Sequence, residues 1–126
     1  MALRARPERE LRNAILTLLR AHGIACWPTG VGAFPASHNG KRRFVRVGTV
    51  GMSDIVGIMR TTDGVHTYGP LVGRALFIEV KNPGGRVSPE QTAFLQTVVR
   101  AGGIGFVAHS VDEVVAKLGL RAKAGR

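Results

Sequence analysis

The chain has 126 residues, of which 44% are hydrophobic, which is enough for one domain with a real core. It carries 18 Lys and Arg against 8 Asp and Glu, a formal net charge of +10, and this excess indicates a polyanionic partner such as nucleic acid. A single cysteine, Cys26, excludes an intrachain disulfide and a cysteine-based zinc site. No apolar run reaches the roughly 18 residues of a membrane span, so we expect a soluble cytoplasmic protein without a membrane partner.

The first half of the chain predicts one helix and two short strands. The helix is predicted over 8–22 because apolar residues recur there at helical spacing, and Gly23 follows as a stop signal. Short apolar runs predict strands at 24–27 and 54–59. The intervening region is rich in turn residues, so we expect a long, partly mobile loop or hairpin with positive charge and a strand at 43–47.

The second half predicts a strand at 75–81, reached through a hairpin-like excursion over 60–74. Ser88 and Gln91 form the pattern of a capping box, which predicts a helix that ends at the glycine pair 102–103. The last elements are a strand at 104–109 and a helix from 110 to 119.

This order, α-β-β-β-α-β-α, predicts a single-domain α/β fold. We expect a mixed central sheet of about four strands with helices on both faces. The predicted domain covers residues 8–119. It is preceded by a flexible basic N-terminus, 1–7, and followed by a basic tail, 120–126.

The predicted strand "ALFIEVK" ends in two ionisable residues. Because side chains alternate along a strand, Glu79 and Lys81 share one face. Asp54 begins the preceding strand, and pairing of the two strands would place it beside Glu79. Two carboxylates can bind a hard cation such as Mg²⁺ together with substrate phosphate, and a lysine can stabilise the charge that develops during phosphodiester hydrolysis. The alternative is a structural ion pair on an edge strand.

These residues also carry a family resemblance. The segments "GMSD", "IEVKNPGGRVSPEQTAFL" and "AGGIGFVAHSVDEV" resemble the PD-(D/E)XK nuclease superfamily and, within it, a stand-alone VRR-NUC domain. The resemblance covers nearly the whole chain and implies a restriction-endonuclease-like fold. It implies that Asp54 and Glu79 bind metal, that the backbone carbonyl of Val80 is a further ligand and that Lys81 is catalytic. The implied cofactor is Mg²⁺, for which Mn²⁺ can substitute.

In that family the first helix usually contributes a glutamate and the second a glutamine. Gln91 matches the glutamine as a catalytic residue, although its capping-box position alone would also justify it. Of the two glutamates in "PERE", Glu8 lies on the apolar side of the predicted helix, so it is the candidate secondary metal ligand; the alternative is an interaction with the helix dipole. Two positions depart from the family pattern, since Ser53 replaces a proline and Arg12 a frequent glutamine.

Basic and aromatic residues indicate where DNA would bind. The candidate DNA-binding residues are Lys41, Arg42, Arg43, Arg46, Arg12 and Arg86. Trp27 and Phe44 could both stack on unpaired bases. Core packing is the favoured interpretation for Trp27, whereas Phe44 lies among basic residues and the two interpretations are balanced.

The sequence therefore predicts a divalent-metal-dependent endodeoxyribonuclease. Stand-alone members of the resembled family are typically homodimers related to Holliday-junction-resolving enzymes, so the resemblance implies a homodimer that cuts branched DNA such as a four-way junction or a flap. The alternative is a non-catalytic or partner-activated nucleic-acid-binding module on the same scaffold, which would bind DNA with a strong dependence on salt.

Overall fold

A computed structural model describes residues 8–30, 32–38, 40–61 and 72–120 of the chain. The predicted N-terminal segment 1–7, and all of the predicted tail except its first residue, lie outside this part. The helices and strands are α1 (Glu8–Ala21), β1 (Ala25–Pro28), β2 (Gly32–His38), β3 (Lys41–Val47), β4 (Ile55–Thr61), β5 (Val72–Val80), α2 (Pro89–Arg100), β6 (Ile104–Ala108) and α3 (Val111–Leu118). In the described ranges, none of the helices has the length and apolarity needed to cross a bilayer.

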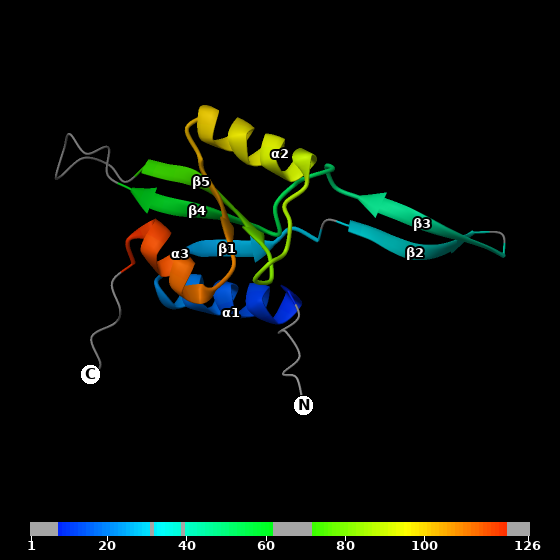
Figure 1. Cartoon of the computed structure of the whole chain (residues 1–126), viewed down its shortest axis with the longest axis horizontal. Coiled ribbons are helices and arrows are strands. Elements are labelled where there is room, and N and C mark those ends of the chain that lie inside the picture. Colours follow the sequence, from blue (N-terminus) through cyan, green and yellow to red (C-terminus); the bar gives the residue numbers. More distant parts are fainter. Residues whose placement is uncertain (1–7, 31, 39, 62–71, 121–126) are drawn as a thin grey trace.

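The central sheet has four strands in the order β1-β4-β5-β6. β4 is antiparallel to both β1 and β5, and β6 is parallel to β5 because α2 forms the crossover between them. Figure 1 shows α2 on one face of this sheet and α1 with α3 on the other. The predicted mixed α/β sheet with helices on both faces is therefore confirmed.

Alternation along β5 separates the two faces. Leu76, Ile78 and Val80 are buried in the core on the side of α1 and α3, where Ile15 and Leu19 of α1 join them. Full burial of each such side chain stabilises the fold by about 1.5–3 kcal/mol. On the opposite face of β5, the Phe77 ring packs edge-on against Phe94 of α2, with the ring centroids 5.1 Å apart.

The region predicted as a loop or hairpin forms a hairpin of β2 and β3, which pair as a separate two-stranded sheet. Its first strand was not indicated by the sequence, because the turn-like residues of "PASHNG" concealed it. Figure 1 shows the hairpin extending away from the central sheet. It is inserted between β1 and β4, so both of its ends join the core where β4 begins.

The segment that leads from this hairpin into β4 packs closely on the start of α2. Gly51 has a φ of +83°, and a Cβ built on it would collide with the backbone carbonyl of Glu90. Only glycine permits both the positive φ and this close approach. The contact fixes the loop before β4 relative to the N-terminal turn of α2, and both carry residues of the candidate site.

We predict that Gly51→Ala destabilises the protein more than Gly23→Ala does. Gly23 has a similar φ of +75° but no atom within 4 Å of a built Cβ, so it provides the matched control for backbone strain alone. That strain is worth about 1–2 kcal/mol. Urea unfolding of the two variants should show the larger loss for Gly51→Ala, and equal losses would contradict the packing role of Gly51.

Candidate active site

The candidate site is formed where the start of β4 meets the end of β5. The register pairs Ile55 with Ile78, so Asp54, one residue before β4, lies opposite Glu79. This is the arrangement that strand alternation and a connecting hairpin predict. The Asp54 carboxylate accepts a 2.8 Å hydrogen bond from the backbone N–H of Val80, which fixes Oδ2 at the end of β5.

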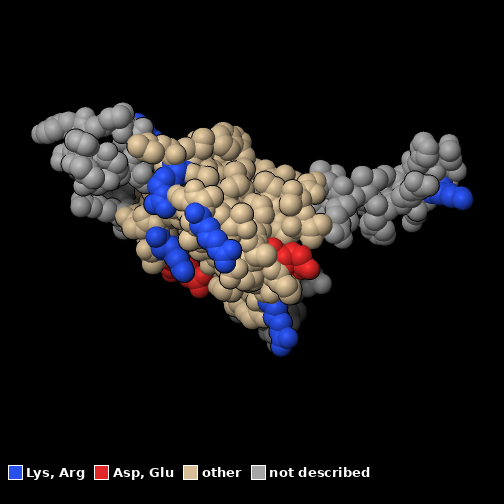
Figure 2. All heavy atoms as spheres, turned by 90° about the horizontal axis from the view of Figure 1, so that it is seen from above, with Lys and Arg blue, Asp and Glu red and all other residues tan. Residues whose placement is uncertain are grey.

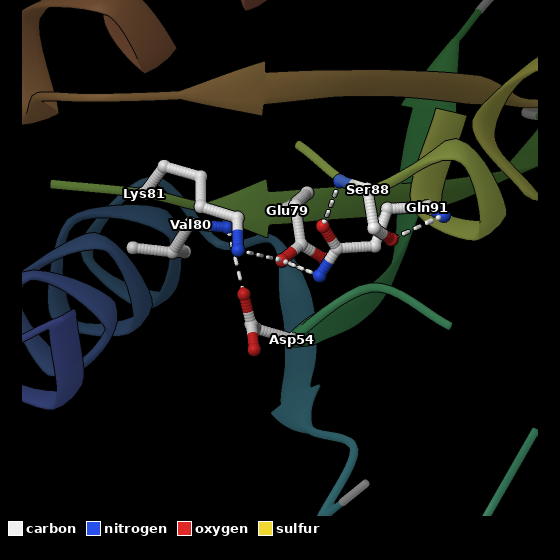
Figure 3. Close-up of polar contacts among 6 residues, drawn as sticks. All are labelled: Asp54, Glu79, Val80, Lys81, Ser88 and Gln91. Carbon is white, nitrogen blue, oxygen red and sulfur yellow. Dashed lines mark hydrogen bonds and ion pairs between the residues drawn. The ribbon is translucent and has the colours of Figure 1, made fainter. Parts of the chain in front are cut away.

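Glu79 is the buried centre of the site, with a side chain only 2% exposed. Its Oε1 accepts a 2.8 Å hydrogen bond from Nε2 of Gln91 and lies 3.7 Å from Nζ of Lys81 (Figure 3). Its Oε2 is buried and has no hydrogen-bond partner. Both polar neighbours thus act on one oxygen of Glu79 and leave the other available.

Gln91 combines two roles that the sequence presented as alternatives. Its Oε1 accepts from the backbone N–H of Ser88 at 2.9 Å, while the Ser88 hydroxyl accepts from the backbone N–H of Gln91 at 3.1 Å. This capping box closes the first turn of α2 and fixes the Gln91 side chain. Because the amide oxygen is used in the cap, the Nε2 group is directed at Glu79, as Figure 3 shows.

The environment of Glu79 raises its pKa from 4.5 to about 8. Burial is the largest cause, because it disfavours the charged carboxylate, and the neighbouring negative charge of Asp54 adds to it. Lys81 opposes both effects without outweighing them. A buried carboxyl group whose pKa is raised in this way is typical of sites that bind a cation or transfer a proton.

The oxygen groups at this site fit a hard divalent cation. Asp54 and Glu79 supply carboxylates, and Oε2 of Glu79 is a buried acceptor without a partner. A strand residue directs its N–H and C=O to the same side, so the Val80 carbonyl faces the side of Asp54, to which its N–H donates. One or two carboxylates with carbonyl and water oxygens are the usual ligands of Mg²⁺.

Glu8 does not join the carboxylate pair directly. It is exposed at the first position of α1, and in the described ranges no three Asp, Glu, His or Cys side chains lie close enough together to hold a metal ion. Its negative charge nevertheless contributes to the raised pKa of Glu79, as the last of the causes. The structure therefore places Glu8 near the site, and its role as a secondary ligand stays a prediction.

The predicted DNA-binding residues are dispersed. Arg86 is exposed in the loop between β5 and α2, Arg12 is half-buried on α1, and Lys41 is exposed at the far end of the hairpin. Figure 2 shows basic side chains spread over the α2 side of the molecule, with one at the end of the hairpin. The side chains of Arg42, Arg43 and Arg46 lie outside the described part.

Sequence reasoning missed Thr29 and misjudged Trp27. The backbone N–H of Thr29 donates to the Asp54 carbonyl at 3.0 Å, and its hydroxyl donates to the Ser53 carbonyl at 2.9 Å, so the residue after β1 holds the segment that carries Asp54 in place. Only the register of β1 against β4 reveals this role.

Trp27 was expected in the core, but it is 51% exposed. The expectation was wrong because Cys26, its neighbour in β1, takes the core-facing position.

An α/β domain whose mixed sheet brings an aspartate, a glutamate and a lysine together has the architecture of a nuclease-type domain. The comparison with protein families agrees, because the model of the VRR-NUC domain matches residues 6–112. The chain therefore belongs to the VRR-NUC family. No curated protein and no solved structure matches it significantly.

The raised pKa of Glu79 predicts that the metal-free protein loses stability as the pH rises. Between pH 4.5 and about 8 the folded state binds more protons at Glu79 than the unfolded state does, so the free energy of unfolding falls across this window. Glu79→Gln should remove most of this slope and raise the Tm at pH 8 in EDTA by several degrees.

Glu90→Gln, a matched change at an exposed glutamate in α2, should leave the slope in place. Thermal unfolding of the three proteins at a series of pH values measures the effect. A wild-type Tm that stays constant over the window, or a Glu79→Gln protein that is less stable at pH 8, would refute the account of Glu79.

Proposed function

We propose that this protein is a divalent-metal-dependent endodeoxyribonuclease that hydrolyses phosphodiester bonds at the Asp54–Glu79 site. The observation that carries the proposal is the free, buried Oε2 of Glu79 beside Asp54, with the ammonium group of Lys81 at 3.7 Å from Oε1. A purely structural ion pair would need only one carboxylate. Two carboxylates beside a single lysine ionise together only where a further positive charge binds, because otherwise one of them keeps a proton.

The proposed ion is Mg²⁺, with Mn²⁺ able to replace it, held by Asp54, Glu79 and the Val80 carbonyl and with Glu8 as an outer contact. When bound, such an ion supplies charge stabilisation for the phosphate and lowers the pKa of a water ligand. Asp54 is held for this role by the Val80 N–H. Gln91 orients Glu79 through Oε1, so that Oε2 remains available to a ligand.

Lys81 has the position of the electrostatic catalyst. Its side chain is 16% exposed, which leaves the ammonium group partly accessible to a phosphate at the surface of the site. A fixed cation next to the reacting phosphate stabilises the negative charge that develops on its oxygens, and removal of one such group typically costs about 10²–10³ in kcat.

For the substrate we propose branched DNA, a four-way junction or a flap, cut by a homodimer. The support is the membership in the VRR-NUC family together with the resemblance to its stand-alone members. A two-fold dimer would present two copies of the site at a fixed spacing, as symmetric cleavage of a junction requires. The net charge of +10 favours phosphate contacts that recognise backbone shape rather than base sequence.

We predict that purified protein cleaves DNA in Mg²⁺ and not in EDTA, with a preference for four-way or flapped DNA over linear duplex. Asp54→Asn should abolish cleavage and Lys81→Ala should lower kcat about 10²-fold or more without weakening DNA binding. The assay measures cleavage of labelled substrates of equal length.

Asp112→Asn and Lys117→Ala serve as matched controls, because both residues lie on α3 and outside the contacts of the site. Both control variants should cleave as the wild type does. Salt-sensitive binding of DNA that stays intact in Mg²⁺ and Mn²⁺ would overturn the proposal in favour of a binding module.

A further inference from the structure

The sheet face that carries the candidate site is only half covered by a helix. One row of side chains on this face runs Trp27, Val56, Phe77 and Gly105 across the four strands. Phe77 packs on Phe94, and a Cβ on Gly105 would touch Leu95, so α2 covers the β5–β6 half. Within the described ranges, α2 packs mainly on β5 and β6, which leaves the β1–β4 half of this face largely open.

Two large apolar side chains are exposed on this open half. Trp27 of β1 is 51% exposed and Ile58 of β4 is 48% exposed. Ile58 pairs with Ala25, and Val56 pairs with Trp27. The two pairs are two residues apart along each strand, so Ile58 and Trp27 share a face of the sheet. Single exposed apolar residues are common, so their position relative to the site decides whether they matter.

Trp27 lies on the same face of the sheet as Asp54 and Glu79 and close to Asp54. Trp27 pairs with Val56, and Thr29, the residue after β1, bonds to the backbone of Asp54, so Trp27 and Asp54 are diagonal neighbours on one face. Such neighbours are roughly 7–8 Å apart, a separation that aromatic side chains span. Arg60, exposed two residues beyond Ile58 on the same strand, adds a cation at the other end of the open surface.

We propose that the indole of Trp27 is a stacking platform for an unpaired base of the DNA strand whose phosphate enters the Asp54–Glu79 site. An exposed aromatic ring needs the free face of a base, and duplex DNA offers none inside its stack, whereas a flap or an opened junction does. Trp27 would thus select substrates with an unpaired nucleotide next to the cut. This inference rests on the proposed nuclease function.

Trp27 is the only tryptophan of the chain, so intrinsic fluorescence reports on this side chain alone. The Asp54→Asn protein, in Mg²⁺, is titrated with a flapped oligonucleotide and with a blunt duplex of the same length. We expect quenching of the tryptophan emission by the flap and little change with the duplex. Unchanged emission while fluorescence anisotropy of labelled flap shows binding would overturn the proposal.

Variants at position 27 give the second measurement, made in the same Asp54→Asn background. Trp27→Ala should raise the Kd for flapped DNA about tenfold, because one base–aromatic stack is lost, and should change the Kd for duplex less than twofold. Trp27→Phe should restore most of the affinity. Val99→Ala, at a residue of α2 that is 54% exposed, is the matched control and should have no effect.

If the Asp54→Asn protein binds the flap with the same affinity with and without Trp27→Ala, the stacking role is refuted. These readouts record binding by a cleavage-deficient protein, so they are independent of whether the parent chain cleaves DNA. If the wild-type protein cleaves DNA but Trp27→Ala does not change flap binding, only the stacking role is refuted. If the flap quenches the tryptophan emission but the wild-type protein never cleaves DNA, only the nuclease proposal is refuted.

Discussion

The site depends on the confinement of two like charges. Asp54 and Glu79 are held side by side where β4 begins and β5 ends, and the burial of Glu79 limits the screening of their repulsion by water. This repulsion, together with burial, raises the pKa of Glu79, so the pair keeps a proton at neutral pH when no cation is present. A protein gains no stability from such a pair by itself, so the surrounding contacts have to hold it in place.

Those contacts come from four separate segments. The Val80 N–H binds Asp54, Thr29 binds the backbone beside it, and Gln91 binds Glu79 from the capped end of α2. Gly51 allows the loop before β4 to approach the same helix end. Each segment is anchored in regular structure, and a site held in this way keeps its geometry before any ligand arrives. The open sheet surface that carries Trp27 continues the same face next to the site.

Much of this arrangement could be predicted because it follows from local periodicity. Alternation put Glu79 on the face opposite Leu76, and the antiparallel pairing of β4 with β5 put Asp54 beside it. The capping box of Ser88 and Gln91 was predictable from four residues. The rest depends on packing between distant segments. Whether Trp27 is buried depends on how far α2 reaches across the sheet, and strand β2 was concealed by turn-forming residues.

The most direct test of the carboxylate pair as a cation site is a calorimetric titration of the protein with Mn²⁺ and Mg²⁺ at pH 7. The account predicts binding that releases protons, because a bound cation ionises Glu79, and it predicts that both the heat and the proton release disappear in Glu79→Gln. An absence of binding by the wild-type protein, or undiminished binding by Glu79→Gln, would contradict it.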